Sequence, residues 1–494
     1  MRDTQKCRSN VLRQSLWHCC VLLVMMAMAA PSLGQTVHRA QGEMAGEVTS
    51  TSAIVQTRLT SVDRNVDGDV PGAVGVARFE YATNEGFGDS RMTEWQPSQP
   101  ENDFIVKAVL TDLQPGTGYF YRVHYGTTQQ NAKTGETCSF RTLQGADGEE
   151  AVSFVVVTGM NYGYFHGIDR EFKGPRPDRA AGYPALETML GMEIDFFVGT
   201  GDNVYYDTQP RETFARTLPQ LRQKWHEQFV QSRFVELFRD VPTYWEKDDH
   251  DHRYNDCDCS GDREPSSELG IATFREQVPI TDPSDREAKT YRTHRVNRDL
   301  QIWLVEGRDY RSPNRMPDGP EKTLWGAEQI AWLKRTLLDS DATFKLLISP
   351  TPLVGPDDGY KIDNHTNHKG FRHEGREFFK WVVEHGLHEQ GFYTVCGDRH
   401  WQYHSQDPLG VEEFSCGAMV DENSRLGRKP GDPKSTDPDA EVHQFYTQSE
   451  ASGGFLRITV GPGTENETGA ARFTFFDDLG EVLYEVTRTR PGPE

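Results

Sequence analysis

Three short segments of the sequence gather aspartate and histidine side chains that could hold metal ions. They span residues 199–206, 245–252 and 397–404. Each follows a run of apolar, β-branched or aromatic residues, which predicts a buried strand. Because α/β folds build their sites where strands end, we expect the three segments to meet in one polar centre.

Metal binding is the chemistry that best fits so many neighbouring carboxylates. Carboxylates packed together repel one another, and burying them without partners is costly. A pair of cations removes that cost. Such a pair can also hold a hydroxide for in-line attack on phosphorus and neutralise the other phosphoryl oxygens. A single Gly-Asp or Asp-x-His occurs in many helix caps and surface loops, but the three segments together indicate a metal centre.

A series of motifs, taken in order, resembles one known family. The motifs are Gly-Asp-x-x-Tyr at 201–205, Asp-Asp-His-Asp at 248–251, Gly-Arg-Asp-Tyr-Arg at 307–311, Gly-Ala-Glu-Gln-x-x-Trp-Leu at 326–333 and Gly-Asp-x-His at 397–400. The series resembles the PhoD-like alkaline phosphatases of the metallophosphoesterase superfamily, which also carry a β-sandwich ahead of the catalytic domain. The resemblance covers nearly the whole chain after residue 34.

The resemblance implies a centre of two metal ions, iron and/or calcium, with other divalent cations also compatible. Asp202 would bridge both ions. Tyr205 and His400 would bind the first ion, and Asp249 and Asp398 would bind the second.

Catalytic side chains are implied in the same way. His250 would lie beside the phosphate and either donate a proton to the leaving oxygen or stabilise its charge. Arg308 and Arg311 would donate charge-assisted hydrogen bonds to the phosphoryl group, unless they form salt bridges beneath the site instead.

The sequence departs from the family at the end of the first strand of the catalytic part. There the family presents Ser-Cys, whose thiolate binds iron, whereas this chain has Thr158 and Gly159. Asn161 stands at the place of the second ligand in the Asp-x-His of the wider superfamily. Its amide oxygen suits a harder cation than a thiolate does, so we include Asn161 among the candidate ligands.

Three further segments leave alternatives open. Asp363, with His365 and His368 as substitutes, is either another ligand or part of a polar surface loop. The loops at 254–264 and 427–440 are either lids that set the preference for monoesters or diesters, or simply mobile.

The chain divides into a β-rich part and a longer α/β part. Residues 35–146 alternate short strands with turns, and the stretch 113–123 resembles the fibronectin type III signature, in which a tyrosine clamps the preceding loop. Residues 150–494 alternate strands with helices, including a long amphipathic stretch over 211–239. We expect a metallophosphoesterase-type α/β sandwich, two sheets flanked by helices, preceded by a small all-β sandwich domain.

The loop at 63–69 resembles the start of a calcium-binding loop. Its ligand-type residues are Asp63, Asn65, Asp67 and Asp69. The glutamate expected at the twelfth position is absent, and Val74 stands there. Both a calcium site and a polar hairpin loop are compatible with this pattern.

The N-terminus and the net charge indicate where the protein acts and on what. Residues 1–34 combine basic residues, an apolar run at 19–30 and small residues near the end, as a cleaved secretory signal does. We therefore expect a secreted or periplasmic protein with no stable membrane anchor after signal removal. The net charge of −22 argues against gripping nucleic acid over a broad surface.

The sequence supports two main functional hypotheses. The first is an exported phosphatase that hydrolyses small phosphate mono- and/or diesters by direct attack of a metal-bound hydroxide. The second is a catalytically impaired metal-binding or surface-binding protein that keeps the fold, motivated by Gly159. The sequence determines neither the oligomeric state nor the natural substrate.

Overall fold

The computed structural model describes residues 36–168, 178–285, 287–463 and 467–491. The expected signal, residues 1–34, lies outside this range. Within the described residues, no helix is both long enough and apolar enough to cross a membrane.

The N-terminal part contains a six-stranded antiparallel sheet. Its strands are β3 (Gly75–Ala82), β4 (Arg91–Met92), β5 (Gln96–Ser98), β7 (Gly118–Gly126), β8 (Lys133–Thr134) and β9 (Cys138–Arg141). The Tyr119 hydroxyl on β7 accepts a hydrogen bond from the Gln114 backbone N–H at 2.9 Å. This tyrosine therefore clamps the preceding loop, as the fibronectin-like signature predicts.

A nine-stranded sheet joins the N-terminal part to the α/β part. Its order is β22 (Val482–Pro491), β21 (Glu467–Asp477), β20 (Gly454–Gly461), β10 (Val152–Val157), β11 (Phe196–Thr200), β12 (Thr243–Glu246), β1 (Glu43–Gly46), β2 (Ala53–Arg58) and β6 (Ile105–Leu110). Strand β1 runs parallel to β12, with Gly46 opposite Thr243. The sequence pattern did not predict this continuity, because it lies in pairing between distant segments.

The second sheet of the α/β part has seven strands. Its order is β13 (Arg292–Arg295), β14 (Leu300–Leu304), β15 (Phe344–Ser349), β16 (Phe392–Cys396), β18 (Glu412–Cys416), β17 (Gln402–Gln406) and β19 (His443–Thr447). Strands β14, β15, β16 and β18 are parallel, as are β10, β11 and β12 in the first sheet.

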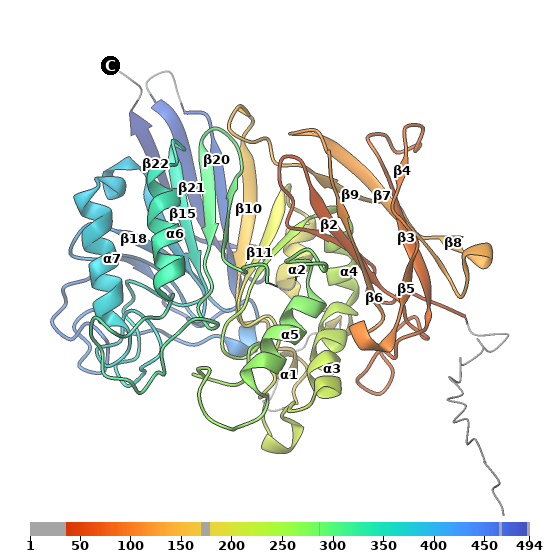
Figure 1. The fold of residues 1–494 in the computed structure, drawn as a ribbon. Coiled ribbons are helices and arrows are strands. Elements are labelled where there is room, and N and C mark those ends of the chain that lie inside the picture. The colour runs from red at the N-terminus through yellow and green to blue at the C-terminus, as the bar shows by residue number, and fades with distance from the viewer. Residues whose placement is uncertain (1–35, 169–177, 286, 464–466, 492–494) are drawn as a thin grey trace, which may run out of the picture. The chain divides into compact units, whose positions relative to one another are not determined.

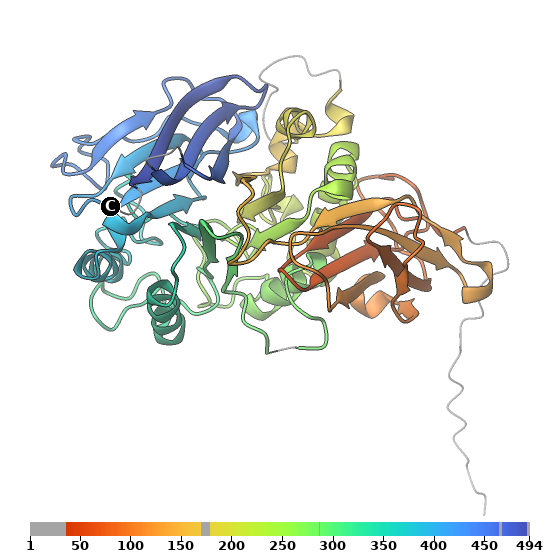
Figure 2. The ribbon, with the colours of Figure 1, turned by 90° about the horizontal axis from the view of Figure 1, so that it is seen from above.

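Helices cover the outer faces of the two sheets (Figures 1 and 2). On the first sheet lie α2 (Pro184–Leu190), α3 (Leu218–Phe229), α4 (Ser232–Asp240) and α5 (Ser267–Gln277), and on the second lie α6 (Ala327–Leu338) and α7 (Arg372–Glu384). The whole apolar run of strand β10 is buried because both faces of the strand are covered. Phe154 and Val156 pack between the sheets, whereas Val155 and Val157 face the helices. The α/β sandwich preceded by a β domain is confirmed.

The amphipathic stretch expected over 211–239 is two helices rather than one. Thr217 and Gln220 form a capping box that begins α3, and the chain becomes extended at Gln231 before α4. The Gln231 side chain donates to the Gln228 carbonyl at 3.0 Å, which satisfies an orphan acceptor at the end of α3. The predicted amphipathic stretch is therefore helical over most of its length, with a break between α3 and α4.

Candidate metal centre

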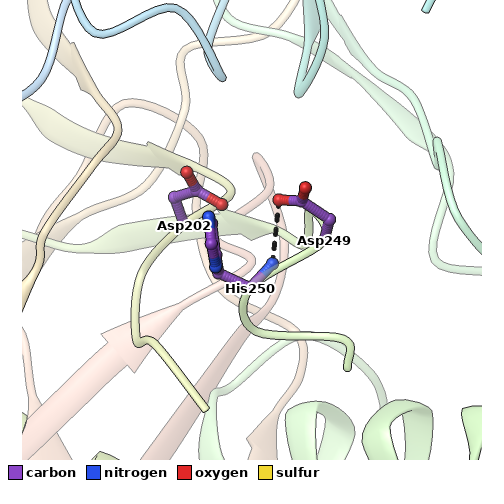
Figure 3. A group of neighbouring side chains, drawn as sticks. All are labelled: Asp202, Asp249 and His250. Atoms are coloured by element: carbon purple, nitrogen blue, oxygen red, sulfur yellow. Dashed lines mark hydrogen bonds between the residues drawn. The ribbon is translucent and has the colours of Figure 1, made fainter. Parts of the chain in front are cut away.

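Three of the motifs, those at 201–205, 248–251 and 397–400, meet at the carboxyl ends of parallel strands from both sheets. The ligand atoms of Asp202, Asp249 and His250 all lie within 4.8 Å of one another (Figure 3). The carboxylates of Asp249, Asp256 and Asp363 form a second group by the same criterion. Because Asp249 belongs to both groups, the two could share one centre.

Tight backbone geometry brings the first two motifs together. Gly201 has φ +78°, and a Cβ placed on it would lie only 2.5 Å from the Asp248 Cβ. Asp202 itself has φ +54° and is buried. Only glycine permits this approach at position 201, so β11 and β12 can end side by side.

Three predicted ligands of the first ion converge around one carboxylate oxygen. The Tyr205 hydroxyl donates to Asp202 Oδ2 at 3.0 Å. His400 Nε2 lies 3.3 Å from the Tyr205 hydroxyl and 3.5 Å from Asp202 Oδ2. The structure thus places together side chains that are almost two hundred positions apart in the chain.

Asp398, a predicted ligand of the second ion, lies beside two positively charged side chains. Burial opposes its charge, but the guanidinium of Arg399 and the ammonium of Lys361 hold its pKa below the ordinary value. Lys361 Nζ lies 3.8 Å from Asp398 Oδ1 and 2.7 Å from Asp256 Oδ1. Lys361 therefore bridges Asp398 and the second carboxylate group.

His250 is held by a carboxylate that sequence reasoning missed. Its Nδ1 lies 2.5 Å from Asp207 Oδ1, and its ring packs on Tyr205 at 4.2 Å between centroids. Burial alone lowers the pKa of His250, but the charges of Asp207, Asp249 and Asp202 outweigh burial and hold it well above the ordinary value. With Asp207 at Nδ1, the other ring nitrogen is left to serve as a proton donor.

Asp256, also missed from the sequence, comes from the loop at 254–264. The guanidinium of Arg253 donates to the backbone carbonyls of Asp258, Ser260, Arg263 and Pro265. These bonds fasten the loop to a buried side chain, so this segment is anchored rather than a free lid.

The donor set fits bound cations. Asp202 Oδ1 and both carboxylate oxygens of Asp363 are buried and have no hydrogen-bond partner among the described residues, and Asp363 Oδ2 has only an ion pair with Arg308 at 3.6 Å. Burial raises the pKa of Asp249 to about 7, since His250 and Arg308 offset it only in part. Buried carboxylate oxygens without partners are stable next to a metal ion and costly otherwise.

Models of two protein families match the chain. The PhoD-like phosphatase model matches residues 154–463, and the model of the PhoD-like phosphatase N-terminal domain matches residues 27–144. The chain belongs to the PhoD-like phosphatase family. It is therefore a hydrolase that acts on phosphoric ester bonds.

Two solved structures share the fold of this PhoD-like phosphatase. A structure of PhoD is similar over 93% of this chain and 90% of its own, with TM-score 0.71 and 18% identity. The purple acid phosphatase PPD1 from yellow lupin (Lupinus luteus) seeds is similar over 91% of this chain and 74% of its own, with TM-score 0.59 and 12% identity. No curated protein matches the chain.

Arg308 and Arg311 lie beneath the centre of this PhoD-like phosphatase. Arg308 is fully buried, with Nη2 2.5 Å from Asp248 Oδ1 and Nη1 donating to the Cys257 carbonyl at 2.7 Å. Arg311 donates to the Gly307 carbonyl at 2.7 Å and to Asn314 Oδ1 at 3.1 Å. The contacts of Arg308 favour the salt-bridge alternative, whereas Arg311 donates to uncharged oxygens. Direct phosphate binding by either arginine stays a prediction.

The remaining candidates in the phosphatase lie at helix or loop ends. Asn161 caps α1 (Tyr162–Phe165), and its Oδ1 accepts from the Tyr164 N–H at 3.0 Å. Its role as a ligand stays a prediction. His365 is bound to Glu374 Oε1 at 2.9 Å, whereas Asp363 belongs to the second carboxylate group.

The contacts of the loop at 63–69 favour the polar hairpin. Asp69 Oδ1 lies 2.6 Å from His226 Nδ1, and Asn65 Oδ1 accepts from the Gly68 N–H at 2.9 Å. Asp63 pairs with Arg64 at 3.0 Å. These three side chains therefore have hydrogen-bond or ion-pair partners within the protein.

Proposed function

We propose that this PhoD-like phosphatase is exported and hydrolyses small phosphate monoesters and/or diesters at a centre of two metal ions. One observation carries the proposal: the ligand atoms of Asp202, Asp249 and His250 lie within 4.8 Å of one another. A second group of carboxylates also contains Asp249. Iron and/or calcium are the proposed ions, other divalent cations being compatible with the same oxygen and imidazole donors.

The side chains divide into two sets in this proposal. Asp202, Tyr205 and His400 would hold one ion, and Asp249 and Asp398 would hold the other, with Asp202 contributing to both. Asn161 and Asp363 are the further candidate ligands. When bound, the cations supply Lewis acidity, which lowers the pKa of water and neutralises charge on the phosphoryl oxygens.

His250 provides the proton chemistry. The Asp207 carboxylate holds Nδ1, so the imidazolium presents Nε2 and can donate a proton to the leaving oxygen. Water attacks phosphorus directly in this proposal, and no covalent bond to the protein forms.

The experiment compares wild type with Asp202→Asn and, as a control, Asp341→Asn, whose exposed carboxylate pairs with Arg295. Hydrolysis of p-nitrophenyl phosphate and bis-p-nitrophenyl phosphate is measured after loading with iron, calcium or both. We expect activity in wild type and the control, and a loss of about 10³-fold or more in Asp202→Asn. The preferred ester then distinguishes monoesterase from diesterase.

The alternative function, a metal-binding protein without turnover, has its own outcome. A wild-type chain that retains metal and is inert on both esters would support it and overturn the hydrolytic proposal.

Export depends on residues 1–34, which lie outside the described residues. We expect protein recovered from the periplasm or medium to begin at Gln35, as read by N-terminal sequencing. Recovery of the full chain in the cytoplasm alone would contradict export.

A further inference from the structure

The hydroxyl of Tyr205 has a partner outside every motif that marks the centre. Asn423 Nδ2 donates to this hydroxyl at 2.8 Å. On its other sides, the hydroxyl contacts Asp202 Oδ2 at 3.0 Å and His400 Nε2 at 3.3 Å. Asn423 lies at the end of a 3₁₀ turn, Asp421–Asn423, that follows β18, and its side chain is buried.

A second contact determines which way the Asn423 amide points. The same Nδ2 donates to the backbone carbonyl of Gly159 at 3.2 Å. A carbonyl oxygen can only accept, so the amide must present its NH₂ group to Gly159 and therefore also to Tyr205. The Tyr205 oxygen accordingly accepts from Asn423 while its own proton is directed at Asp202.

Gly159 makes room for this amide. Its φ is +67°, and a Cβ placed on it would lie 3.0 Å from the Ala418 Cβ and 3.3 Å from Asn423 Nδ2. Ala418 cannot move aside easily, because Thr158 pairs with it and the Met419 N–H donates to the Thr158 carbonyl at 2.8 Å. A side chain at position 159 would therefore press on the Asn423 amide.

We propose that Asn423 is a positioning residue that orients the Tyr205 oxygen as a metal ligand, in the space that Gly159 leaves open. The inference rests on the proposed metal centre. Beyond orientation, a hydrogen bond donated to a phenolate withdraws electron density from its oxygen. Asn423 thus adjusts how strongly Tyr205 donates to the ion, and Gly159 and Asn423 act as one unit.

The test uses the visible absorption of the full chain loaded with ferric iron. Tyr205→Phe is expected to abolish a phenolate-to-iron charge-transfer band that wild type shows. Asn423→Leu, which keeps the volume and removes the donor, is expected to shift that band to longer wavelength, because the phenolate becomes more electron-rich. Asn423→Gln restores a donor and is expected to move the band back part of the way.

Metal retention and coupling provide independent readouts. We expect Asn423→Leu to lose iron to a chelator about tenfold faster than wild type, equivalent to ~1.4 kcal/mol. Gly159→Ala should shift the band as Asn423→Leu does, and the double variant should shift it no further, because both changes remove one contact. Ser424→Ala, which alters the neighbouring side chain, should leave the band unchanged. Asn423→Ala replaces Asn423→Leu if the leucine variant does not fold.

The outcomes separate this inference from the proposed function. A band at the wild-type wavelength in Asn423→Leu and Asn423→Ala would overturn the role of Asn423. A wild-type protein that hydrolyses esters but shows no band dependent on Tyr205 would overturn the inference and leave the proposed function standing. A wild-type protein that neither hydrolyses esters nor binds metal would overturn both this inference and the proposed function.

Discussion

At the scale of single residues, the centre combines candidate ligands that a motif marks with supporting side chains that no motif marks. Asp207 orients His250, and Lys361 bridges Asp256 and Asp398. Supporting residues of this kind fix the rotamer and the charge of the groups they contact. Replacing them therefore changes the position and the charge of the groups that react.

Asp207→Asn is expected to lower kcat about tenfold or more, since general acid catalysis contributes about 10²–10⁴-fold. The Asp207 charge raises the pKa of His250, so its removal lowers that pKa. The protonated form is then lost at lower pH, and the alkaline limb of the kcat profile moves to lower pH. A kcat–pH profile of the metal-loaded enzyme measures both effects. An unchanged alkaline limb would contradict the pairing.

The sequence predicted the residues at this scale only in part. Asp202, Asp249 and His250 stand directly after apolar strands, and that placement is a readable signal. Asp207 carries a weaker one, since it lies in the same loop as Asp202. Asn423 carries none, because its place beside Tyr205 depends on the pairing of Thr158 with Ala418.

At the scale of elements, strand ends and buried charges hold the loops that carry the candidate ligands. Glu413 on β18 accepts from three successive backbone N–H groups, those of Leu353, Val354 and Gly355, and from the Tyr403 hydroxyl. These residues begin the loop that carries Asp363. The Glu413 carboxylate thus fixes the backbone where the loop that carries Asp363 begins.

Glu413→Gln tests this arrangement. A neutral amide offers one acceptor oxygen in place of two and adds a donor facing N–H groups, so we expect a loss of about 1–3 kcal/mol in the free energy of unfolding. Urea unfolding measures that loss, and a titration of the variant with calcium should show weaker binding. Wild-type stability and wild-type calcium affinity together would exclude the proposed support.

A buried charge network joins α3 to the N-terminal part. Asp103 Oδ2 lies 2.6 Å from His226 Nε2, and Asp103 Oδ1 lies 3.1 Å from Arg58 Nη2. Burial opposes ionisation, but His226 and Arg58 outweigh it and lower the pKa of Asp103 to about 2 from 3.8. A lowered carboxyl pKa stabilises the fold above pH 3.8, and that stability is lost as the pH falls through about 2.

Asp103→Asn is therefore expected to reduce the free energy of unfolding by about 2 kcal/mol at neutral pH. The difference in the free energy of unfolding between the variant and wild type should shrink from pH 4 down to pH 2, because Asp103 of wild type takes up a proton in this range. The ordinary pKa of this carboxyl is 3.8, and its pKa in the folded protein is about 2. Urea unfolding across this range measures it, with Asp147→Asn in the exposed linker as control. A difference that does not change with pH would contradict the charge network.

At the scale of the whole molecule, the β-rich part completes a sheet of the catalytic part. Strand β1 covers the edge of β12, and β2 and β6 extend the same sheet. The sequence predicted both parts and the alternation of strands and helices, because periodicity and turn residues are local signals. It could not predict the shared sheet, since pairing between β1 and β12 joins segments almost two hundred residues apart.

Removing the N-terminal part should therefore harm the catalytic part. A chain that begins at residue 147 leaves the edge of β12 unpaired, and exposed edge strands promote aggregation. We expect this truncated chain to elute as aggregates in size-exclusion chromatography, whereas the chain beginning at residue 35 does not. A monomeric and active truncated protein would show that the two parts fold independently.

The central claim is that the two side-chain groups that have Asp249 in common form one centre for two metal ions. Elemental analysis of protein purified without chelators, wild type beside Asp249→Asn, tests it most directly. We predict about two metal ions for each wild-type chain and a marked loss in the variant, with circular dichroism showing an intact fold. A metal-free wild type that still hydrolyses phosphate esters, or a variant that keeps its full metal content, would contradict the account.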